Sequence, residues 1–337
     1  MNSRGRAKGT LKKKKDRYDM AKILVTGAAG FIGSRLALKL LQRGDEVVGI
    51  DNLNDYYDTN LKRRNLADIQ SLSGFTFAQV DFCDAAAVRK LFDAHRFDAL
   101  AHIGAMASVR YSVKNPALYS TVNVHGSVNL FEAARSQGPV HLLLASTGSV
   151  YGSSTPVPFS ESAAADRPLA AYPASKRAME IFSHSYAHVF SMPVTVLRFF
   201  NVYGPHGRPD MMPWQWTTDI LAGRELTLFD GGRLKRDWTY IDDILDGFLK
   251  ALDTPDGYRI FNLGCGNPVE NTEFVRTLEQ ILGKTARINA VPAPVSEPKI
   301  TYADITRARQ QIGYEPKVQV REGLERFIAW LRQEKII

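Results

Sequence analysis

A tyrosine and a lysine four positions apart are the residues of this chain best suited to acid–base chemistry. Tyr172 and Lys176 stand in the segment Tyr-Pro-Ala-Ser-Lys, and at this spacing two side chains share one face of a helix. A free phenol has a pKa of ~10, and a neighbouring ammonium lowers that pKa by favouring the phenolate. The pair therefore predicts a group that moves a proton on and off a substrate hydroxyl.

A glycine-rich turn, Thr26-Gly-Ala-Ala-Gly-Phe-Ile-Gly33, indicates a bound partner that accepts a hydride. Its G-x-x-G-x-x-G spacing, between a predicted strand and a predicted helix, lets the backbone approach a pyrophosphate at the helix N-terminus. Asp51 ends the next strand, where a carboxylate accepts hydrogen bonds from ribose hydroxyls and repels a 2′-phosphate. NAD is thus favoured over NADP. Asp81, which ends a third strand, either reaches the adenine amino group or caps the strand.

Short apolar runs alternate with helical patterns through the first two thirds of the chain. Strands are expected near 22–26, 46–50, 75–80, 98–103, 140–146 and 194–199, and helices near 31–43, 84–95, 116–137 and 172–190. Continuous apolar strands that alternate with helices indicate a parallel sheet covered on both faces. The predicted fold class is α/β, a Rossmann-type doubly wound parallel sheet with a smaller, mostly C-terminal substrate-binding domain.

The domain boundaries follow a change in composition near residue 203, after which prolines and glycines become frequent. An NAD-binding domain is expected over 20–202, and 236–267 is expected to return to it with a strand at 258–263. The nucleotide-sugar-binding domain is expected over 203–235 and 268–337. Residues 1–19 are expected to form a disordered basic tail.

Composition excludes several classes of protein. The chain of 337 residues is 45% hydrophobic and 23% charged, as in ordinary globular proteins. It has neither the ~18–20-residue apolar run of a membrane span nor the apolar core of a signal peptide. Its two cysteines, Cys83 and Cys265, lack metal-site spacing, which predicts no metal and a cytoplasmic location. The tail carries eight basic and two acidic residues, so it accounts for most of the net charge of +8, and no nucleic-acid partner is predicted.

A third hydroxyl is expected beside the phenol, at the end of a central strand. Ser146, Thr147 and Ser149, in Ser-Thr-Gly-Ser-Val-Tyr-Gly, are the candidates, although such residues also cap helices and form turns.

Together these motifs resemble the extended short-chain dehydrogenase/reductases and, more narrowly, the nucleotide-sugar epimerases. The resemblance runs from about residue 20 to the end and includes Leu-Arg-Phe-Phe-Asn-Val-Tyr-Gly-Pro at 197–205. It implies that Thr147 is the catalytic hydroxyl, that Tyr172 is the acid/base, and that Lys176 lowers the phenol pKa and holds the nicotinamide ribose. It also implies that Arg236 binds the nucleotide diphosphate, and that Phe229 lies beside the uracil, unless it packs in the core. The implied NAD contacts are Gly27, Gly30, Phe31, Ile32, Gly33, Asp51, Asn52, Asp81 and Lys176.

The residues just before Val-Tyr-Gly limit the types of reaction that the resemblance implies. In the similar 4,6-dehydratases an Asp-Glu pair stands there, and the related decarboxylases usually have a glutamate at the second position. This chain has Gly148 and Ser149, so the resemblance implies neither elimination nor decarboxylation. It implies 4-epimerisation through a 4-keto intermediate, with tightly bound NAD regenerated in each cycle.

Three segments resemble those of UDP-glucuronate 4-epimerases: 51–58, 109–112 with Arg110, and 204–211 with Arg208. A sugar carboxylate calls for hydroxyl donors and a nearby cation. The hydroxyls at 146, 147 and 149 are candidates for the donors, and Arg208 is the candidate for the cation. Asn201 stands where these epimerases usually have threonine. Asparagine is common in relatives that act on neutral sugars, but its amide can still donate to a carboxylate.

Three alternatives stay open: a 4-epimerase of neutral UDP-hexoses, which Asn201 favours, a UDP-glucuronate decarboxylase, and a redox-sensing NAD-binding protein. Sensors of this kind often lack the tyrosine or the lysine, both of which are present. The resemblance also implies a homodimer through a four-helix bundle built from the helices near 116–137 and 172–190.

Overall fold

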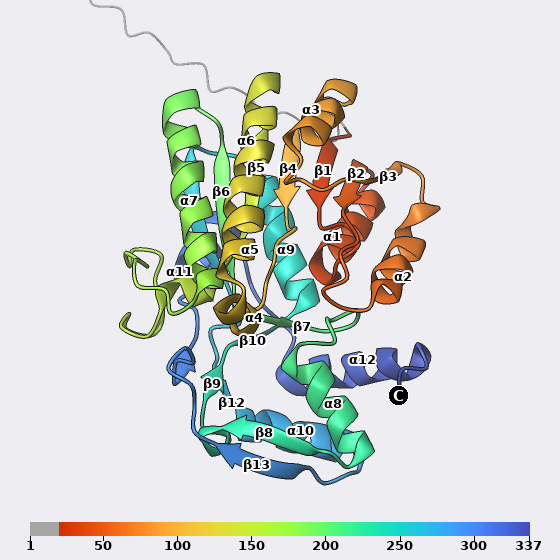
Figure 1. Cartoon of the computed structure of the whole chain (residues 1–337), viewed down its shortest axis with the longest axis vertical. Helices are drawn as coiled ribbons and strands as arrows, with labels where there is room; N and C mark the ends of the chain where they lie inside the picture. The colour runs from red at the N-terminus through yellow and green to blue at the C-terminus, as the bar shows by residue number, and fades with distance from the viewer. Residues whose placement is uncertain (1–19) are drawn as a thin grey trace, which may run out of the picture.

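The computed structural model describes residues 20–337 (Figure 1). The predicted basic tail, 1–19, lies outside the described residues. The core element is a seven-stranded parallel sheet with the order β11-β6-β5-β4-β1-β2-β3. Its strands are β1 (Lys22–Thr26), β2 (Glu46–Asp51), β3 (Phe75–Gln79), β4 (Ala99–His102), β5 (His141–Thr147), β6 (Val194–Phe199) and β11 (Tyr258–Leu263).

The sheet is covered by helices on both faces, as the apolar strands predict. Helices α1 (Phe31–Gln42), α2 (Thr59–Gln70) and α9 (Ile241–Leu252) contribute to the core on one face. Helices α3 (Ala85–Ala94), α6 (Gly126–Gln137) and α7 (Ala171–Phe190) contribute to the core on the other, nearer the viewer in Figure 1. The predicted doubly wound α/β class is confirmed.

The expected strands and helices coincide with observed ones to within a few residues, except that one expected helix is divided and several observed helices were not expected. Helix α2 follows the Asn54–Asp58 loop and has no counterpart among the predicted elements. The helix expected over 116–137 consists of α5 (Pro116–Ser120), a π-helical segment η1 (Thr121–His125) and α6. Segment η1 is wound more loosely than an α-helix, with hydrogen bonds between residues five positions apart.

The strand order reverses between β1 and β4, because β2 and β3 continue to one side of β1 while β5, β6 and β11 continue beyond β4. In parallel sheets the crevice beyond the carboxyl ends of such neighbouring strands is the usual ligand site. The glycine loop follows β1 at this position. Ser146 and Thr147 end β5, two strands away.

The smaller part of the molecule lies below the sheet in Figure 1 and contains three small sheets. These pair β7 (Asn201–Tyr203) with β10 (Trp238–Tyr240), β8 (Glu225–Phe229) with β13 (Arg287–Val291), and β9 (Lys235–Arg236) with β12 (Val269–Glu270) and β14 (Ile300–Thr301). Its helices are α8 (Met212–Ala222), α10 (Asn271–Leu282) and α12 (Val320–Gln333).

The segment 268–337 does not lie wholly in this smaller part. Helix α11 (Thr306–Ile312) packs against α9 and β11 of the main sheet. Strand β11 itself pairs in parallel with β6. The remaining short elements are α4 (Val109–Lys114) and the 3-10 turns η2 (Gly148–Tyr151) and η3 (Asp230–Gly232).

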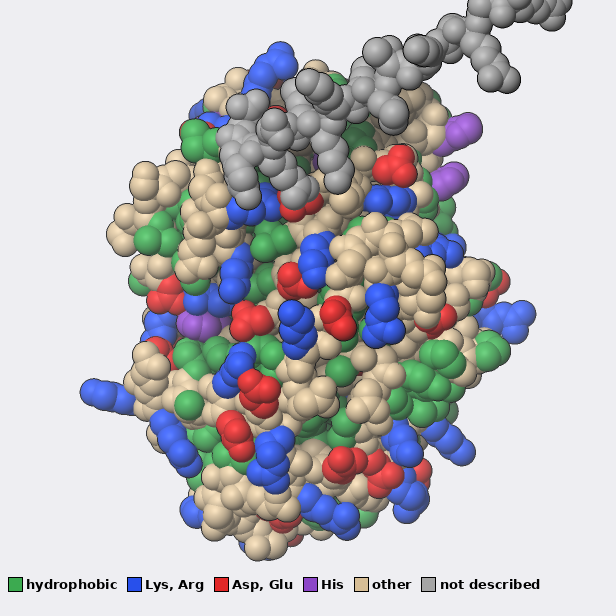
Figure 2. All heavy atoms as spheres, turned by 180° about the vertical axis from the view of Figure 1, so that it is seen from behind, with side chains coloured by type: hydrophobic (Ala, Val, Ile, Leu, Met, Phe, Trp, Pro, Cys, Tyr) green, Lys and Arg blue, Asp and Glu red, His purple; other side chains and the backbone are tan. Residues whose placement is uncertain are grey.

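The surface is of mixed charge. Figure 2 shows acidic and basic side chains interspersed on the rear face. Within 20–337, none of the helices has both the length and the apolar character that crossing a membrane requires.

Candidate active site

A cavity of about 560 Å³ opens at the carboxyl ends of the parallel strands. It is lined by the glycine loop, by the loops that follow β2, β4 and β5, by the start of α7, and by β7 with the loop beyond it. Every predicted cofactor residue lines it: Gly27, Gly30, Phe31, Ile32, Gly33, Asp51, Asn52, Asp81 and Lys176. So do Ser146, Thr147, Ser149, Tyr172, Asn201 and Arg208, whereas Arg110, Phe229 and Arg236 do not.

The glycine loop has the close approaches that its spacing predicts. A Cβ on Gly33 would stand 2.0 Å from the carbonyl oxygen of Gly27, and a Cβ on Gly27 would stand 2.8 Å from Cα of Gly104. Gly27 also has φ +68°, a conformation that glycine adopts readily. Any side chain at these positions would therefore push the turn away from α1 and from the β4 loop, and close the space for a pyrophosphate.

Asp51 is fixed at the end of β2 with its carboxylate at the cavity. Its Oδ1 accepts from the backbone N–H of Leu53 at 2.8 Å, and its Oδ2 accepts from that of Ala29 at 3.3 Å. Nζ of Lys62 lies 3.7 Å from Oδ1, and both side chains are largely buried. The sequence analysis did not single out Lys62, because its approach to Asp51 depends on how α2 packs.

A buried ammonium without a partner shows that the cavity fits a dinucleotide. Lys176 is 2% exposed, and its Nζ makes no hydrogen bond within the described part of the chain. Buried donors are normally paired, so this one is directed at a ligand group such as the ribose hydroxyls of a nicotinamide nucleotide. Burial lowers the pKa of Lys176 to about 8, while Glu180 acts in the opposite direction.

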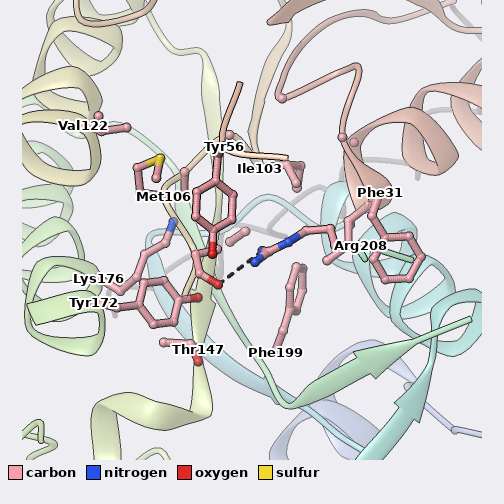
Figure 3. Close-up of a pocket in the computed structure, with 18 of the residues that line it drawn as sticks. Phe31, Tyr56, Ile103, Met106, Val122, Thr147, Tyr172, Lys176, Phe199 and Arg208 are labelled. Atoms are coloured by element: carbon pink, nitrogen blue, oxygen red, sulfur yellow. Dashed lines mark hydrogen bonds between the residues drawn. The ribbon is translucent and has the colours of Figure 1, made fainter. Parts of the chain in front are cut away.

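Tyr172 lies in the same cavity as Thr147, and Figure 3 shows the two side chains close to Lys176. Burial raises the pKa of the Tyr172 phenol, while a hydrogen bond with Thr147 and the charge of Arg208 lower it. The sequence analysis expected Lys176 to lower this pKa below its ordinary value. In the ligand-free protein, loss of water around the phenol outweighs the effects of Thr147 and Arg208, and the influence of Lys176 on the phenol stays a prediction.

Ser146 has a structural partner. Its hydroxyl donates to Oε1 of Glu180 at 2.5 Å, in a site where Glu180 is 0% exposed. A serine has a single hydroxyl proton, so Ser146 is not free to donate to a substrate carboxylate as predicted. Thr147 and Ser149 remain as hydroxyl candidates. The Thr147 hydroxyl oxygen also accepts from the backbone N–H of Ser149 at 3.2 Å.

Asn123, in the π-helical segment η1, joins the β4 loop to the start of α7. Its Oδ1 accepts from the backbone N–H of Met106, and its Nδ2 donates to the Met106 carbonyl and to Oγ of Ser175, each at 2.9 Å. The Ser175 hydroxyl in turn donates to the carbonyl of Tyr172 at 2.8 Å. These bonds fix the first turn of α7 relative to the cavity. The signal in the sequence, one of two asparagines within a helical stretch of mixed polarity, is too weak to find it.

Arg208 reaches into the cavity from the loop before α8 (Figure 3). Its Nε and Nη2 donate to the two carboxylate oxygens of Asp210 at 2.9 and 2.6 Å, and its Nη1 donates to the carbonyl of Ala107 at 3.2 Å. A guanidinium has five N–H donors, so donors remain for a ligand. The Asp210 contact raises the pKa of Arg208, which keeps it charged.

The other three predicted substrate residues form a second cluster beside the cavity. Nη2 of Arg236 donates to Oε2 of Glu297 at 2.8 Å, and Nη2 of Arg110 lies 3.6 Å from Oε1 of the same carboxylate. The Arg110 guanidinium lies 4.8 Å above the ring of Phe229. Thr301, which lines the cavity, is in register with Arg236. Two arginines and an aromatic ring thus stand together at the border of the site.

Several known proteins are similar to this chain in sequence and in fold. Residues 23–264 match the NAD dependent epimerase/dehydratase family. UDP-glucuronate 4-epimerase 5 from Arabidopsis thaliana is 42% identical over 326 residues, which cover 91% of this chain and 74% of that protein.

Two solved structures are similar over almost the whole chain. UDP-glucuronic acid 4-epimerase from Bacillus cereus, in complex with UDP-glucuronic acid and NAD, has a TM-score of 0.87 and 35% identity, covering 93% of this chain and 99% of that one. UDP-glucose 4-epimerase from Thermotoga maritima, with UDP-glucose, has a TM-score of 0.84 and 30% identity over the same shares.

The family match spans more than two thirds of the chain, and it includes both the glycine loop and the Tyr172–Lys176 helix. The chain belongs to the NAD dependent epimerase/dehydratase family.

Proposed function

We propose that this protein interconverts UDP-glucuronate and UDP-galacturonate by NAD-dependent 4-epimerisation. One observation favours a uronate rather than a neutral sugar as the substrate. Arg208 enters the same cavity as Thr147, Tyr172 and Lys176, so a cation stands within the space that receives the reacting sugar. A neutral hexose has no group that calls for this charge, whereas a carboxylate binds it with charge-assisted hydrogen bonds.

In this mechanism, Tyr172 takes the proton of the C4 hydroxyl and later returns it. The cavity residues, with Lys176 and Asp51 among them, would hold NAD, which when bound would supply the hydride acceptor and donor for C4. Thr147 donates to the phenolic oxygen, and Lys176 holds the nicotinamide ribose while its positive charge favours the phenolate. Burial of Lys176 strengthens its interactions, because little water screens its charge.

The 4-keto intermediate of a uronate is a β-keto acid, which loses carbon dioxide when its carboxylate stands perpendicular to the ketone. Arg208 and the hydroxyl of Ser149 would hold that carboxylate in place, because the single hydroxyl proton of Thr147 is already donated to the phenolic oxygen. Neither position 148 nor position 149 has a carboxylic acid that could assist decarboxylation or elimination of water. The enzyme therefore completes the epimerisation.

The cluster of Arg110, Phe229 and Arg236 is assigned to the nucleotide end of the substrate. Guanidinium groups match phosphate oxygens geometrically, and Phe229 offers an apolar face to the uracil. Glu297 would have to release both arginines when a diphosphate arrives, since its carboxylate holds them in the ligand-free protein.

The test uses the purified protein with its bound NAD, incubated separately with UDP-glucuronate and UDP-glucose and followed by NMR. UDP-galacturonate formed without carbon dioxide is the expected result. Formation of UDP-xylose, or conversion of UDP-glucose alone, would refute the proposal. Conversion of UDP-glucose alone would support a 4-epimerase of neutral UDP-hexoses instead. Asn201 favours that alternative, because asparagine is common in relatives that act on neutral sugars and because Asn201 lines the cavity.

A homodimer through α5–α6 and α7 is proposed on the basis of their exposed apolar side chains. Phe182 and Val189 on α7 are 45% and 64% exposed, and Leu118 on α5 is 37% exposed, as expected of a face that a second copy covers. Light scattering should show a dimer that Phe182→Glu converts to a monomer. Val295→Glu, at a residue 99% exposed in the other part of the molecule, is the control. A monomeric wild type would refute the dimer.

The proposed location is the cytoplasm, supported by two free cysteines, Cys83 and Cys265, and by a nucleotide-sugar substrate. Fractionation of the native cells, with activity in the cytoplasmic fraction, is the measurement. Recovery of the enzyme outside the cytoplasm would contradict it.

A further inference from the structure

The three segments whose sequences suggested a uronate substrate meet in space at one side chain. Tyr56, in the loop between β2 and α2, lies against Tyr111 of α4 and against the Arg208–Asp210 pair before α8. These residues are separated by 55 to 154 positions in the chain. Three loops thus share one contact point at the wall of the cavity.

The contacts of Tyr56 are specific in geometry. Its hydroxyl donates to Oδ2 of Asp210 at 3.0 Å, and its ring packs edge-on against Tyr111 with 5.1 Å between centroids. Cζ of Arg208 lies 5.7 Å from the centre of the same ring. Figure 3 shows the Tyr56 side chain beside the Arg208 guanidinium at the cavity.

The hydroxyl of Tyr56 weakens the interaction between Arg208 and Asp210. Oδ2 of Asp210 accepts both from Nη2 of Arg208 and from Tyr56. A second donor satisfies part of the negative charge of Asp210, so the carboxylate binds Arg208 less tightly than it would alone. The ring and the Ala107 carbonyl then limit how the guanidinium can turn.

We propose that Tyr56 is a specificity-determining positioning residue, which holds the Arg208–Asp210 pair so that Arg208 presents its remaining donors to the carboxylate of the substrate sugar. The inference rests on the proposed uronate substrate. Without the hydroxyl, Asp210 competes more strongly for Arg208 and the guanidinium can shift away from the sugar. A neutral hydroxymethyl group does not use the cation, so the effect falls on the uronate alone.

The first test compares Tyr56→Phe with the wild type, both as full chains loaded with NAD. A lost hydrogen bond to a charged group predicts a fall of roughly tenfold in kcat/KM for UDP-glucuronate. Most of it should come from a higher KM, with kcat little changed. Any turnover of UDP-glucose should stay as it was, so the ratio of the two kcat/KM values falls.

Tyr57→Phe is the matched control, because Tyr57 belongs to the same loop but makes no hydrogen bond to Asp210 within the described residues. It should leave the ratio unchanged. An unaltered ratio in Tyr56→Phe, in an enzyme that does epimerise UDP-glucuronate, would overturn the inference while the proposed function stands. A wild-type protein without activity on UDP-glucuronate would instead refute both the inference about Tyr56 and the proposed function.

A double-mutant cycle separates positioning from an independent role. In the Arg208→Ala background Tyr56 has no guanidinium to position, so adding Tyr56→Phe should cause no further loss of preference for UDP-glucuronate. Losses that multiply would mean that Tyr56 acts without Arg208, and would overturn the inference. Bound NAD and melting temperature, measured on each variant, identify any general loss of folding.

Discussion

Arg198 and Glu180 form an ion pair, with 2.7 Å between Nη2 and Oε2, in which the side chains are 1% and 0% exposed. Glu180 stands one turn beyond Lys176 on α7, and Arg198 lies on β6. The same carboxylate accepts from Ser146 at the end of β5. This buried carboxylate therefore ties the helix that carries the acid/base to the strand that carries Thr147.

Replacing Glu180 by glutamine should lower the free energy of unfolding by about 3–5 kcal/mol, because Arg198 would remain buried without a counter-charge. Urea unfolding measures the change. Glu325→Gln removes a partner of Arg321 in a pair that is more than half exposed, and should change stability by less than about 1 kcal/mol. Equal effects of the two variants would contradict this account of the buried pair.

Tyr172→Phe should reduce turnover roughly a thousandfold, because the variant has no group to accept the C4 proton. The ring remains, so NAD should stay bound in a normal amount. Product formation by NMR and nucleotide released on denaturation are the two measurements. Substantial residual activity would mean that another group is the acid/base.

Lys176→Met should abolish turnover and yet stabilise the nucleotide-free protein at pH 7. The pKa of Lys176 is lowered to about 8 from 10.5, so the unfolded chain holds this proton more tightly than the folded one. Burial of the ammonium therefore opposes folding at neutral pH by on the order of 3 kcal/mol. That penalty disappears as pH rises from 8 toward 10.5, and the advantage of the variant should shrink over this range.

Urea unfolding of both nucleotide-free proteins at a series of pH values tests this prediction. A variant that is less stable than the wild type at every pH would show that Lys176 contributes more through packing than it loses through burial of its charge.

Asp51→Asn should weaken the preference for NAD over NADP roughly tenfold, because it removes the charge that repels a 2′-phosphate. Lys62, 3.7 Å from Asp51, would then lose the neighbouring negative charge, so that its own positive charge would attract that phosphate. Dissociation constants for both nucleotides are the measurement. Asp55→Asn, an exposed acid of the same loop, is the control. An unchanged preference in Asp51→Asn would assign selectivity to other residues.

The parts of the site that were predictable from sequence are contained in short contiguous motifs. Gly27, Gly30 and Gly33 are tied to one turn, and Tyr172 and Lys176 to one helical face, so local geometry alone places them. The sheet was equally predictable, since each buried parallel strand is a continuous apolar run between helical patterns.

The missed features depend on partners distant in the chain. Glu180, 34 positions away, accepts the hydrogen bond of the Ser146 hydroxyl, which changes the role expected of that serine. Tyr56 gains its importance only where three loops converge, and Asn123 only because the helix around it is π-helical. Long-range packing decides such contacts, and neither spacing nor residue type reveals it.

Glu297 places a negative charge between Arg236 and Arg110 before any substrate arrives. Under the proposed assignment of these arginines to the nucleotide, an entering UDP-sugar would exchange one anion for another rather than meet two unpaired cations. The electric field outside the site is weakened accordingly, and salt screens the remaining field beyond about 8 Å. Capture of the nucleotide would then be governed by short-range exchange at the arginines and would depend little on long-range attraction or on ionic strength.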